Sequence, residues 1–562
     1  MRARLLAAGA LALAAVAALP LRADDVRGEL RKYKKSIGRP SLYIRTLAIE
    51  ALAGTHDEAA LKELVKRYQR PERPEDHVAY LVAGICAEDF AEASHLDTWR
   101  GWLKKQRRAP DAWLWYLGQR TLVKCAASDD AKAALTDPKL DPCLRAAALL
   151  ALGSAGPADE GLAAVATVLG DAKAMDKLRP AERSAVVAAA ASTLVKCKAL
   201  LGKEAFTRAG TLVIDELDQK DALQHTRWVI ARHLAHALDG EQLFLTSEPW
   251  RAALLGAAAR ADRGEPGPNA TRLRPVGLGA GATVPRFLGI EGTGTRIAFV
   301  IDCSDSMLTP LTEVEKQDLK AGRRPVTGSA QQPQPKEPKE EEDPLAKLPW
   351  DRIKTRFDAA REALALSLEE LGEKMHFAVI TFGTESQALS PSLLPASKAN
   401  VQATIRSLRR IKVKVGDAER PNGKLQGYTN LHGALLDAFQ LTSGPSIPVH
   451  EHVDPRAFQE GVDTIFVLSD GAPSWDDFAA VDKNDIDMTS GDPESGAKGG
   501  KLGVLNFYGP YTFPKHLARD VVRLNLLRRV ELHCVGIGEA NAALLEGLAK
   551  LGMGEFKSIR AR

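Results

Sequence analysis

Hydrophobic residues follow a helical period in the first half of the chain and a strand-like pattern only in the second. From about residue 24 to residue 263, Ala and Leu recur at intervals of three to four positions, as in 45–54 and 145–153. No convincing alternation of apolar and polar residues interrupts this stretch. We therefore predict that residues 24–263 form an all-α half.

Two of these helical segments share residues at matching offsets. Residues 45–52 and 145–152 both carry Arg, then Ala three and six positions later, then Leu. Small residues let helices pack closely, and stacked two-helix units bury a face that one unit cannot cover alone. The half thus resembles HEAT-type or armadillo-type repeats, although no fixed period emerges, and an irregular helical domain is the alternative. A solenoid would serve as a binding surface or as a rigid spacer.

Short apolar runs begin near residue 295 and alternate with amphipathic segments at 351–371 and 431–440 that are typical of helices. Each run predicts a buried strand, and the runs lie at 296–302, 376–382, 464–468 and 530–536. Strands that alternate with helices indicate a doubly wound α/β domain with a mostly parallel sheet. In such domains ligands bind beyond the carboxyl ends of the strands, where the strand order reverses.

Composition separates the two halves and marks insertions. Residues 264–294 are rich in Gly, Pro, Thr and Arg, which indicates a linker. The α/β domain is expected to cover 295–562. It is longer than its strands and helices require, and the excess lies in three predicted insertions at 307–350, 442–461 and 476–514.

The first 23 residues have the layout of a secretory signal. Arg2 and Arg4 precede an unbroken apolar run at 5–19, and cleavage is expected after Ala23. The alternative is an uncleaved membrane anchor. No later stretch is apolar enough to span a bilayer, so the remaining chain is expected to be secreted or periplasmic, with no integral membrane segment after removal of the signal.

Charge and cysteine content exclude several classes of protein. The chain has 76 Lys and Arg against 72 Asp and Glu, a net charge of +4, so no nucleic-acid partner is expected. Six cysteines without a C-x-x-C motif exclude a disulfide-dense scaffold and a zinc ribbon.

Polar residues gather where the topology places a ligand. Asp302, Ser304 and Ser306 follow the first predicted strand, Thr429 precedes a predicted helix, and Asp470 follows the strand at 464–468. Two carboxylates and three hydroxyls form an all-oxygen set suited to Mg²⁺ or Mn²⁺. Because only two of these groups carry charge, a bound ion would keep positive character and an open coordination position for a partner carboxylate.

These five residues resemble the metal-ion-dependent adhesion site of von Willebrand factor A-type domains. The resemblance implies a non-enzymatic adhesion or assembly protein, in which the hydroxyls ligate the metal directly and the aspartates often act through water. It implies a protein partner that donates an Asp or Glu. The chain lacks the Asp-Asp pair of integrin-type members and has Leu308, Thr309 and Pro310 at that place.

Trp475, Asp476 and Asp477 leave the same strand end as Asp470. We expect them to form the rim of the site and to contact a partner. The alternative for Trp475 is simple packing.

Two other functions use the same residues. Haloacid-dehalogenase-like phosphatases also place an Asp at a strand end, but they need a second Asp two residues later, where this chain has Ser304. A structural protein, whose metal only stabilises the loops, has the same ligands. No G-x-S-x-G, P-loop or H-E-x-x-H motif indicates another enzyme class.

Overall fold

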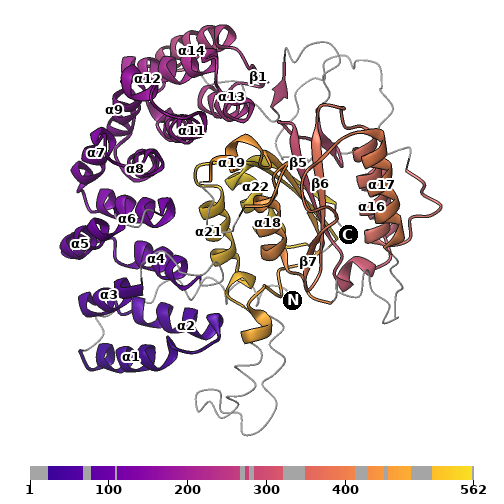
Figure 1. The fold of residues 1–562 in the computed structure, drawn as a ribbon, viewed down its shortest axis with the longest axis horizontal. Coiled ribbons are helices and arrows are strands. Elements are labelled where there is room, and N and C mark those ends of the chain that lie inside the picture. The colour runs from indigo at the N-terminus through magenta and orange to yellow at the C-terminus, as the bar shows by residue number, and fades with distance from the viewer. Residues whose placement is uncertain are drawn as a thin grey trace.

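The N-terminal helices form a curved arc, and the C-terminal α/β domain lies on its concave side (Figure 1). This computed structural model describes residues 23–67, 77–107, 111–265, 273–276, 284–320, 348–411, 427–447, 454–482, 509–538 and 540–559. The expected signal at 1–23 lies outside the described residues, apart from Ala23.

The described part of the arc is built of helices, as the sequence predicts, except for one two-residue strand at Gln242–Leu243. Its helices are α1 (Ala23–Ser36), α2 (Leu42–Ala53), α3 (Glu58–Leu64), α4 (Val78–Asp89), α5 (Leu96–Gln106), α6 (Ala112–Lys124), α7 (Ser128–Thr136), α8 (Pro142–Ala155), α9 (Ala158–Leu169), α10 (Ala172–Met175), α11 (Pro180–Lys196), α12 (Glu204–Asp215), α13 (Gln224–Leu238) and α14 (Ser247–Asp262).

Small residues allow the arc helices to approach closely. A Cβ added at Gly153 of α8 would lie 2.5 Å from the hydroxyl oxygen of Thr193 on α11, so only glycine permits this contact. Asp141 begins α8 by accepting a hydrogen bond from the Cys143 N–H, and Pro142 occupies the first turn, where its missing N–H costs nothing.

The C-terminal domain contains a sheet in the order β11-β10-β9-β5-β6-β7. β11, β10, β9, β5 and β6 are parallel, whereas β7 and β8 pair with β6 in the antiparallel sense. The strands are β5 (Arg296–Asp302), β6 (His376–Phe382), β7 (Ser386–Ala388), β8 (Leu394–Pro395), β9 (Thr464–Ser469), β10 (Glu531–Ile537) and β11 (Met553–Ile559). The chain runs from β5 to β6 on one side and later returns to β9 on the other. The strand order therefore reverses between β5 and β9.

Helices cover both faces of the sheet. α16 (Arg356–Glu369) and α17 (Lys398–Arg410) lie on the face away from the arc, while α18 (Leu431–Gln440), α21 (Pro514–Leu524) and α22 (Ala542–Leu551) lie on the other (Figure 1). The smaller helices are α15 (Glu313–Lys320) and α19 (Pro455–Gln459). The predicted doubly wound α/β domain is confirmed.

The segment expected to be a linker contributes to two small sheets. β2 (Arg274–Pro275) pairs with β1 (Gln242–Leu243), and β3 (Arg286–Phe287) forms a hairpin with β4 (Ile290–Glu291). The Phe287 ring packs edge-on against Phe299 and Phe466, which draws the hairpin into the core of the α/β domain.

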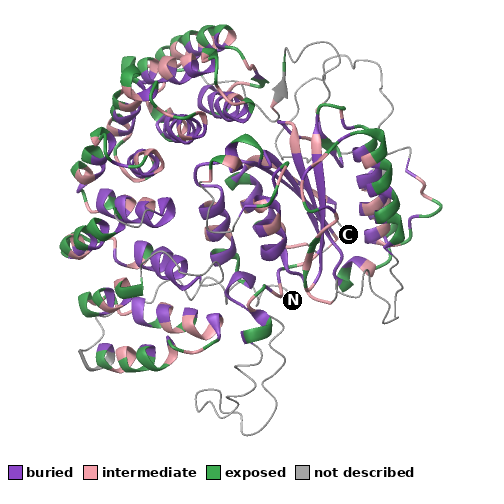
Figure 2. Ribbon diagram, in the orientation of Figure 1, coloured by how far each residue is buried: buried purple, intermediate pink, exposed green. Residues whose placement is uncertain are grey.

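The hydrophobic cluster of the arc reaches into the α/β domain, which also has an apolar cluster on each face of its sheet. The apolar cluster of the arc continues into the C-terminal residues Phe458, Tyr511, Leu526 and Leu527, all buried. Figure 2 shows that α4, α6, α18 and α21, which lie between the outer arc and the sheet, are largely buried. The concave side of the arc is thus covered by the chain's own second half.

The cysteines, the tryptophans and the helix lengths show how the described part of the chain is stabilised. All six cysteines are free, and Trp99, Trp102, Trp113 and Trp115 are core residues. No helix among the described residues is long and apolar enough to cross a membrane.

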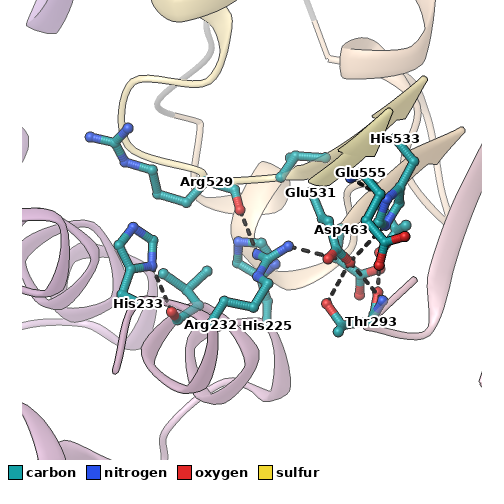
Figure 3. A network of polar contacts seen from close by, with 12 residues as sticks. His225, Arg232, His233, Thr293, Asp463, Arg529, Glu531, His533 and Glu555 are labelled. Atoms are coloured by element: carbon teal, nitrogen blue, oxygen red, sulfur yellow. Dashed lines mark hydrogen bonds and ion pairs between the residues drawn. The ribbon is translucent and has the colours of Figure 1, made fainter. Parts of the chain in front are cut away.

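A buried ion pair joins the arc to the amino ends of the strands (Figure 3). Arg232 of α13 lies 3.5 Å from the Glu531 carboxylate at the start of β10, and its guanidinium donates to the Arg529 carbonyl at 2.6 Å. Glu531 also accepts hydrogen bonds from the N–H and the hydroxyl of Thr293. Burial raises the pKa of Glu531, but His533, Arg232 and Thr293 outweigh it and lower the pKa to about 2.

We expect Glu531 to make the fold sensitive to acid. Its folded pKa lies below the ordinary value of 4.5, so its contribution to stability is complete above pH 4.5 and is lost as the pH falls to about 2. Replacing Glu531 with Gln should lower the free energy of unfolding by on the order of 3 kcal/mol at pH 7. The difference from wild type should vanish near pH 2 in urea unfolding. Glu546→Gln, which removes an exposed partner of Lys550, should show no such convergence.

Candidate metal centre

Three loops meet at the carboxyl ends of β5 and β9. Asp302 is the last residue of β5, Ser304 directly precedes the short 3₁₀ helix Asp305–Leu308, and Ser306 lies within that helix. Asp470 follows β9, and Thr429 lies two residues before α18. The five predicted ligands therefore come from the point where the strand order reverses.

Hydrogen bonds connect four of these residues directly. The Ser304 and Ser306 hydroxyl oxygens are 3.1 Å apart, and the Ser306 hydroxyl donates to the Asp470 carboxylate at 2.6 Å. The Ser304 N–H donates to Asp302 at 2.8 Å. Ser306 is exposed, whereas the other four residues are buried. The site thus opens to solvent on the Ser306 side.

Gly471 leaves space in front of the hydroxyl groups. A Cβ at this position would lie 3.3 Å from the Thr429 hydroxyl oxygen and 3.6 Å from that of Ser306. Both hydroxyl oxygens therefore lie close to Gly471. A larger side chain at Gly471 would project beside these two oxygens.

Asp302 is held by groups that sequence patterns do not identify. The Ser469 hydroxyl, from the last residue of β9, donates to its second carboxylate oxygen at 2.6 Å. Burial, and then the charge of Asp470, raise the pKa of Asp302. Burial likewise raises the pKa of Asp470. The hydrogen bonds to these two carboxylates therefore do not fully offset the cost of burying their charge.

Arg356 and Glu315 complete the buried charges around Asp470. The Arg356 guanidinium, at the start of α16, lies 3.1 Å from the Asp470 carboxylate and 2.9 Å from that of Glu315 on α15. A Cβ at Gly538 would lie 2.1 Å from the guanidinium carbon, so the absence of a side chain there makes room for Arg356. Glu315 belongs to the first predicted insertion and also accepts from the Thr312 N–H. The insertion thus supports the site.

The sum of these charges fits a divalent cation. Asp470 and Glu315 both pair with the Arg356 guanidinium, and Asp302 is buried close to Asp470 without a cationic partner of its own among the described residues, so these four groups carry two more negative than positive charges when all are ionised. Buried charges are stable only when they are paired or bind a metal ion. The surrounding oxygen donors are those that Mg²⁺ and Mn²⁺ prefer, so the residues present fit such an ion.

The Thr429 loop is fixed by its neighbours. The Thr429 N–H donates to the Ser474 hydroxyl at 3.0 Å, and the Ser474 N–H returns a bond to the Thr429 carbonyl at 3.1 Å. Asn430 begins α18 by accepting from the Gly433 N–H, and its side chain donates to Asp477 at 2.7 Å. The loops that carry Thr429 and Asp470 are therefore joined.

The expected rim residues lie in different environments. The Trp475 ring stacks on Tyr428 with 4.7 Å between centroids, and both rings are half-buried. Asp477 is exposed and bonded to Asn430. Asp476 has no exposed surface, because it accepts from the N–H groups of Phe478 and Tyr511. Asp476 therefore stabilises the loop after β9 from inside the protein, through these two hydrogen bonds.

The strand order of the C-terminal half and a comparison with known protein families indicate the same type of domain. A family model described as the von Willebrand factor type A domain matches residues 351–482 and 514–557. The C-terminal half contains a von Willebrand factor type A domain. The match includes Thr429 and Asp470, ends before the long loop after residue 482, and does not reach β5 with Asp302, Ser304 and Ser306.

Other comparisons add little to the von Willebrand factor type A assignment. No curated protein matches the sequence. Among solved structures, a PilB minor pilin from Streptococcus sanguinis is similar with a TM-score of 0.26 and 15% identity, over 53% of this chain and 64% of the pilin. The chain thus covers less than two thirds of the pilin's length. At this TM-score the likeness supports no further conclusion.

We expect Arg356 to stabilise the von Willebrand factor type A domain by pairing with Asp470. Replacing it with Met leaves a buried carboxylate without its partner, which should lower the free energy of unfolding by roughly 3 kcal/mol in urea titrations with EDTA. Arg361→Met is the matched control on the same helix, because Arg361 pairs with Asp358 and Glu362 nearer the surface. It should cost about 1 kcal/mol or less. Equal losses in the two variants would contradict the assignment.

Proposed function

We propose that this protein is an extracytoplasmic, non-enzymatic binding protein that captures a partner carboxylate through a divalent cation held by Asp302, Ser304, Ser306, Thr429 and Asp470. The observation that carries the proposal is the pair of buried carboxyl groups, Asp302 and Asp470, beside three hydroxyl groups at the strand-order reversal. A bound Mg²⁺ or Mn²⁺ supplies a Lewis-acidic position for an Asp or Glu of a protein partner. The family match supports a protein-interaction module.

The chain's own residues define what the ion would meet. Ser304, Ser306 and Thr429 are neutral ligands, so they would leave positive charge on the ion facing the partner. Asp302 and Asp470 would supply the negative charge that partly neutralises the ion. One Asp470 oxygen already accepts a hydrogen bond from Arg356. Trp475 stacks on Tyr428, which directly precedes Thr429, and the exposed Asp477 is bonded to Asn430, which directly follows Thr429. We assign these groups to the partner-contacting rim.

The phosphatase alternative is weaker because Asp302 has both carboxylate oxygens engaged and Ser304 cannot act as an acid. The Ser304 N–H and the Ser469 hydroxyl donate to Asp302. Ser304 contacts Ser306 through its hydroxyl. A nucleophilic Asp needs a nearby proton donor for the leaving group.

The proposal predicts one Mg²⁺ or Mn²⁺ ion per chain in titration calorimetry of the full-length protein. Asp302→Asn and Thr429→Ala remove one charge and one oxygen ligand and should each weaken binding by about 100-fold. Thr404→Ala, which removes a buried hydroxyl on α17, and Asp351→Asn, which removes an exposed carboxylate, should leave binding unchanged. Equal affinity in wild type and Asp302→Asn would refute the metal site.

Partner capture should depend on both the metal and a carboxylate. We expect immobilised peptides with a single Asp or Glu to retain the protein in Mg²⁺, and EDTA or the amide analogues of these peptides to abolish retention. Turnover of para-nitrophenyl phosphate that is lost in Asp302→Asn would instead establish the enzyme. Unfolding upon metal removal, without any carboxylate-dependent retention, would establish a purely structural ion.

A further inference from the structure

The loops that carry Thr429 and Asp470 continue into residues that face the arc. His432, in the first turn of α18, is fully buried. Its ring stacks on Tyr511 with 3.8 Å between centroids, and its Nε2 is hydrogen-bonded to Asp520 of α21 at 2.9 Å. The helix that follows Thr429 is therefore held from the arc side of the sheet.

The Asp470 loop reaches the same place. Six residues after Asp470, the Asp476 carboxylate accepts from the Tyr511 N–H at 2.9 Å and from the Phe478 N–H at 2.9 Å. The loop then continues to Asp482, whose carboxylate accepts from the Tyr43 N–H in the first turn of α2 at 3.2 Å. A carboxylate in this position compensates the unpaired N–H groups of the arc helix.

One residue of the arc, His77, lies next to residues that follow both the Thr429 loop and the Asp470 loop. His77, directly before α4, is buried and hydrogen-bonded through Nδ1 to the Tyr511 hydroxyl at 2.5 Å. Its ring lies 5.1 Å from the Phe478 ring and 6.1 Å from the His432 ring, between centroids. His77 and Tyr511 are 434 positions apart in sequence, so this contact exists only because the arc closes on the domain.

The same residues are spaced closely enough to hold a metal ion, but their charges favour a hydrogen-bonded junction. Ligand atoms of His77, His432 and Asp520 lie within 4.8 Å of one another. Arg523 donates to both oxygens of Asp520, at 2.6 and 3.0 Å. With neutral imidazoles the group has no net negative charge, and a cation there would face a buried guanidinium. Buried ions without a counter-charge are strongly unfavourable.

We propose that His77 is a positioning residue for the metal site: its contact with Tyr511, which binds Asp476 and stacks on His432, fixes the loops that carry Thr429 and Asp470. The arc is then part of the site although it supplies no ligand. The relevance to partner binding rests on the proposed function, whereas the effect on the loops can be measured without metal.

Hydrogen exchange of the full-length protein in EDTA tests this inference. In His77→Leu, the amides of 427–433 and 471–478 should exchange about tenfold faster, because their local opening becomes easier. The amides of Cys303 and Ser304, which donate to the Phe382 carbonyl of β6 and to the Asp302 carboxylate, should keep their wild-type rates. His77→Gln, which can still bond to Tyr511, should restore protection. Unchanged exchange at 427–433 and 471–478 in His77→Leu would overturn the proposal.

A matched control lies in the same interface. Glu88 of α4 pairs with Arg519 at 2.7 Å and with Lys515 at 3.1 Å, but none of these contacts involves the two loops. Glu88→Gln should leave exchange in both loops unchanged. If it accelerated the loops as much as His77→Leu, general loosening of the arc would explain the effect and the proposal would fail. Should His77→Leu not fold, Tyr511→Phe removes only the hydroxyl partner and should give the same pattern.

Metal titration connects the loops to the site. Mg²⁺ should bind His77→Leu about tenfold more weakly than wild type, as for other residues that orient ligands without touching the ion. Absence of Mg²⁺ and Mn²⁺ binding by the wild type would refute the proposed function, and the exchange experiment would still decide the role of His77. Wild-type affinity in His77→Leu, together with faster loop exchange, would overturn the positioning of ligands.

Discussion

Negative charge buried at the carboxyl ends of β5 and β9 is the constraint around which this half of the molecule is organised. Two adjacent parallel strands end in Asp302 and beside Asp470, so their carboxylates are forced close together. Burial raises the pKa of both carboxyl groups, so the ionised form of each is costly to keep in this position. The pairing of Arg356 with Asp470, the hydroxyl groups and the small residue at Gly471 are all explained by this one requirement.

The arc holds the domain at both ends of its strands. At the amino ends, Arg232 forms a buried ion pair with Glu531, and at the carboxyl ends His77 contacts Tyr511. Between them the apolar core continues from the arc into Leu526 and Leu527. A helical solenoid would be expected from sequence to offer a binding surface or to act as a spacer. Here its concave side binds the chain's own domain.

Sequence reasoning recovers what depends on local pattern. The apolar runs predict β5, β6, β9 and β10 within one or two residues, because buried parallel strands need continuous apolar side chains. The spacing of Asp302, Ser304 and Ser306 predicts three ligands, and the structure brings these residues together near Asp470. The short strands β7 and β8 have weak patterns and escape prediction, whereas α17 is not among the predicted helices although Val401, Ile405 and Leu408 recur at helical spacing.

Contacts between distant segments leave no such signal. Glu315 and Arg356 are 41 positions apart, on either side of a segment without apolar pattern, and only the folded chain shows that Glu315 and Asp470 share the Arg356 guanidinium. Asp476 looks like a rim residue in the sequence because it is acidic and near Asp470, yet two N–H groups draw it inside. The hairpin at Arg286–Glu291 was hidden by its Gly-rich surroundings, although Phe287 binds it to the core.

The central place of β5 has a mechanical consequence. This strand is hydrogen-bonded along its length to β9 on one side and to β6 on the other, and its carboxyl end carries Asp302. Tension applied to that end along the strand would have to shear two ladders of backbone hydrogen bonds simultaneously, rather than open them one after another. The site is therefore attached to an interior strand, which backbone hydrogen bonds on both sides hold against extraction by force.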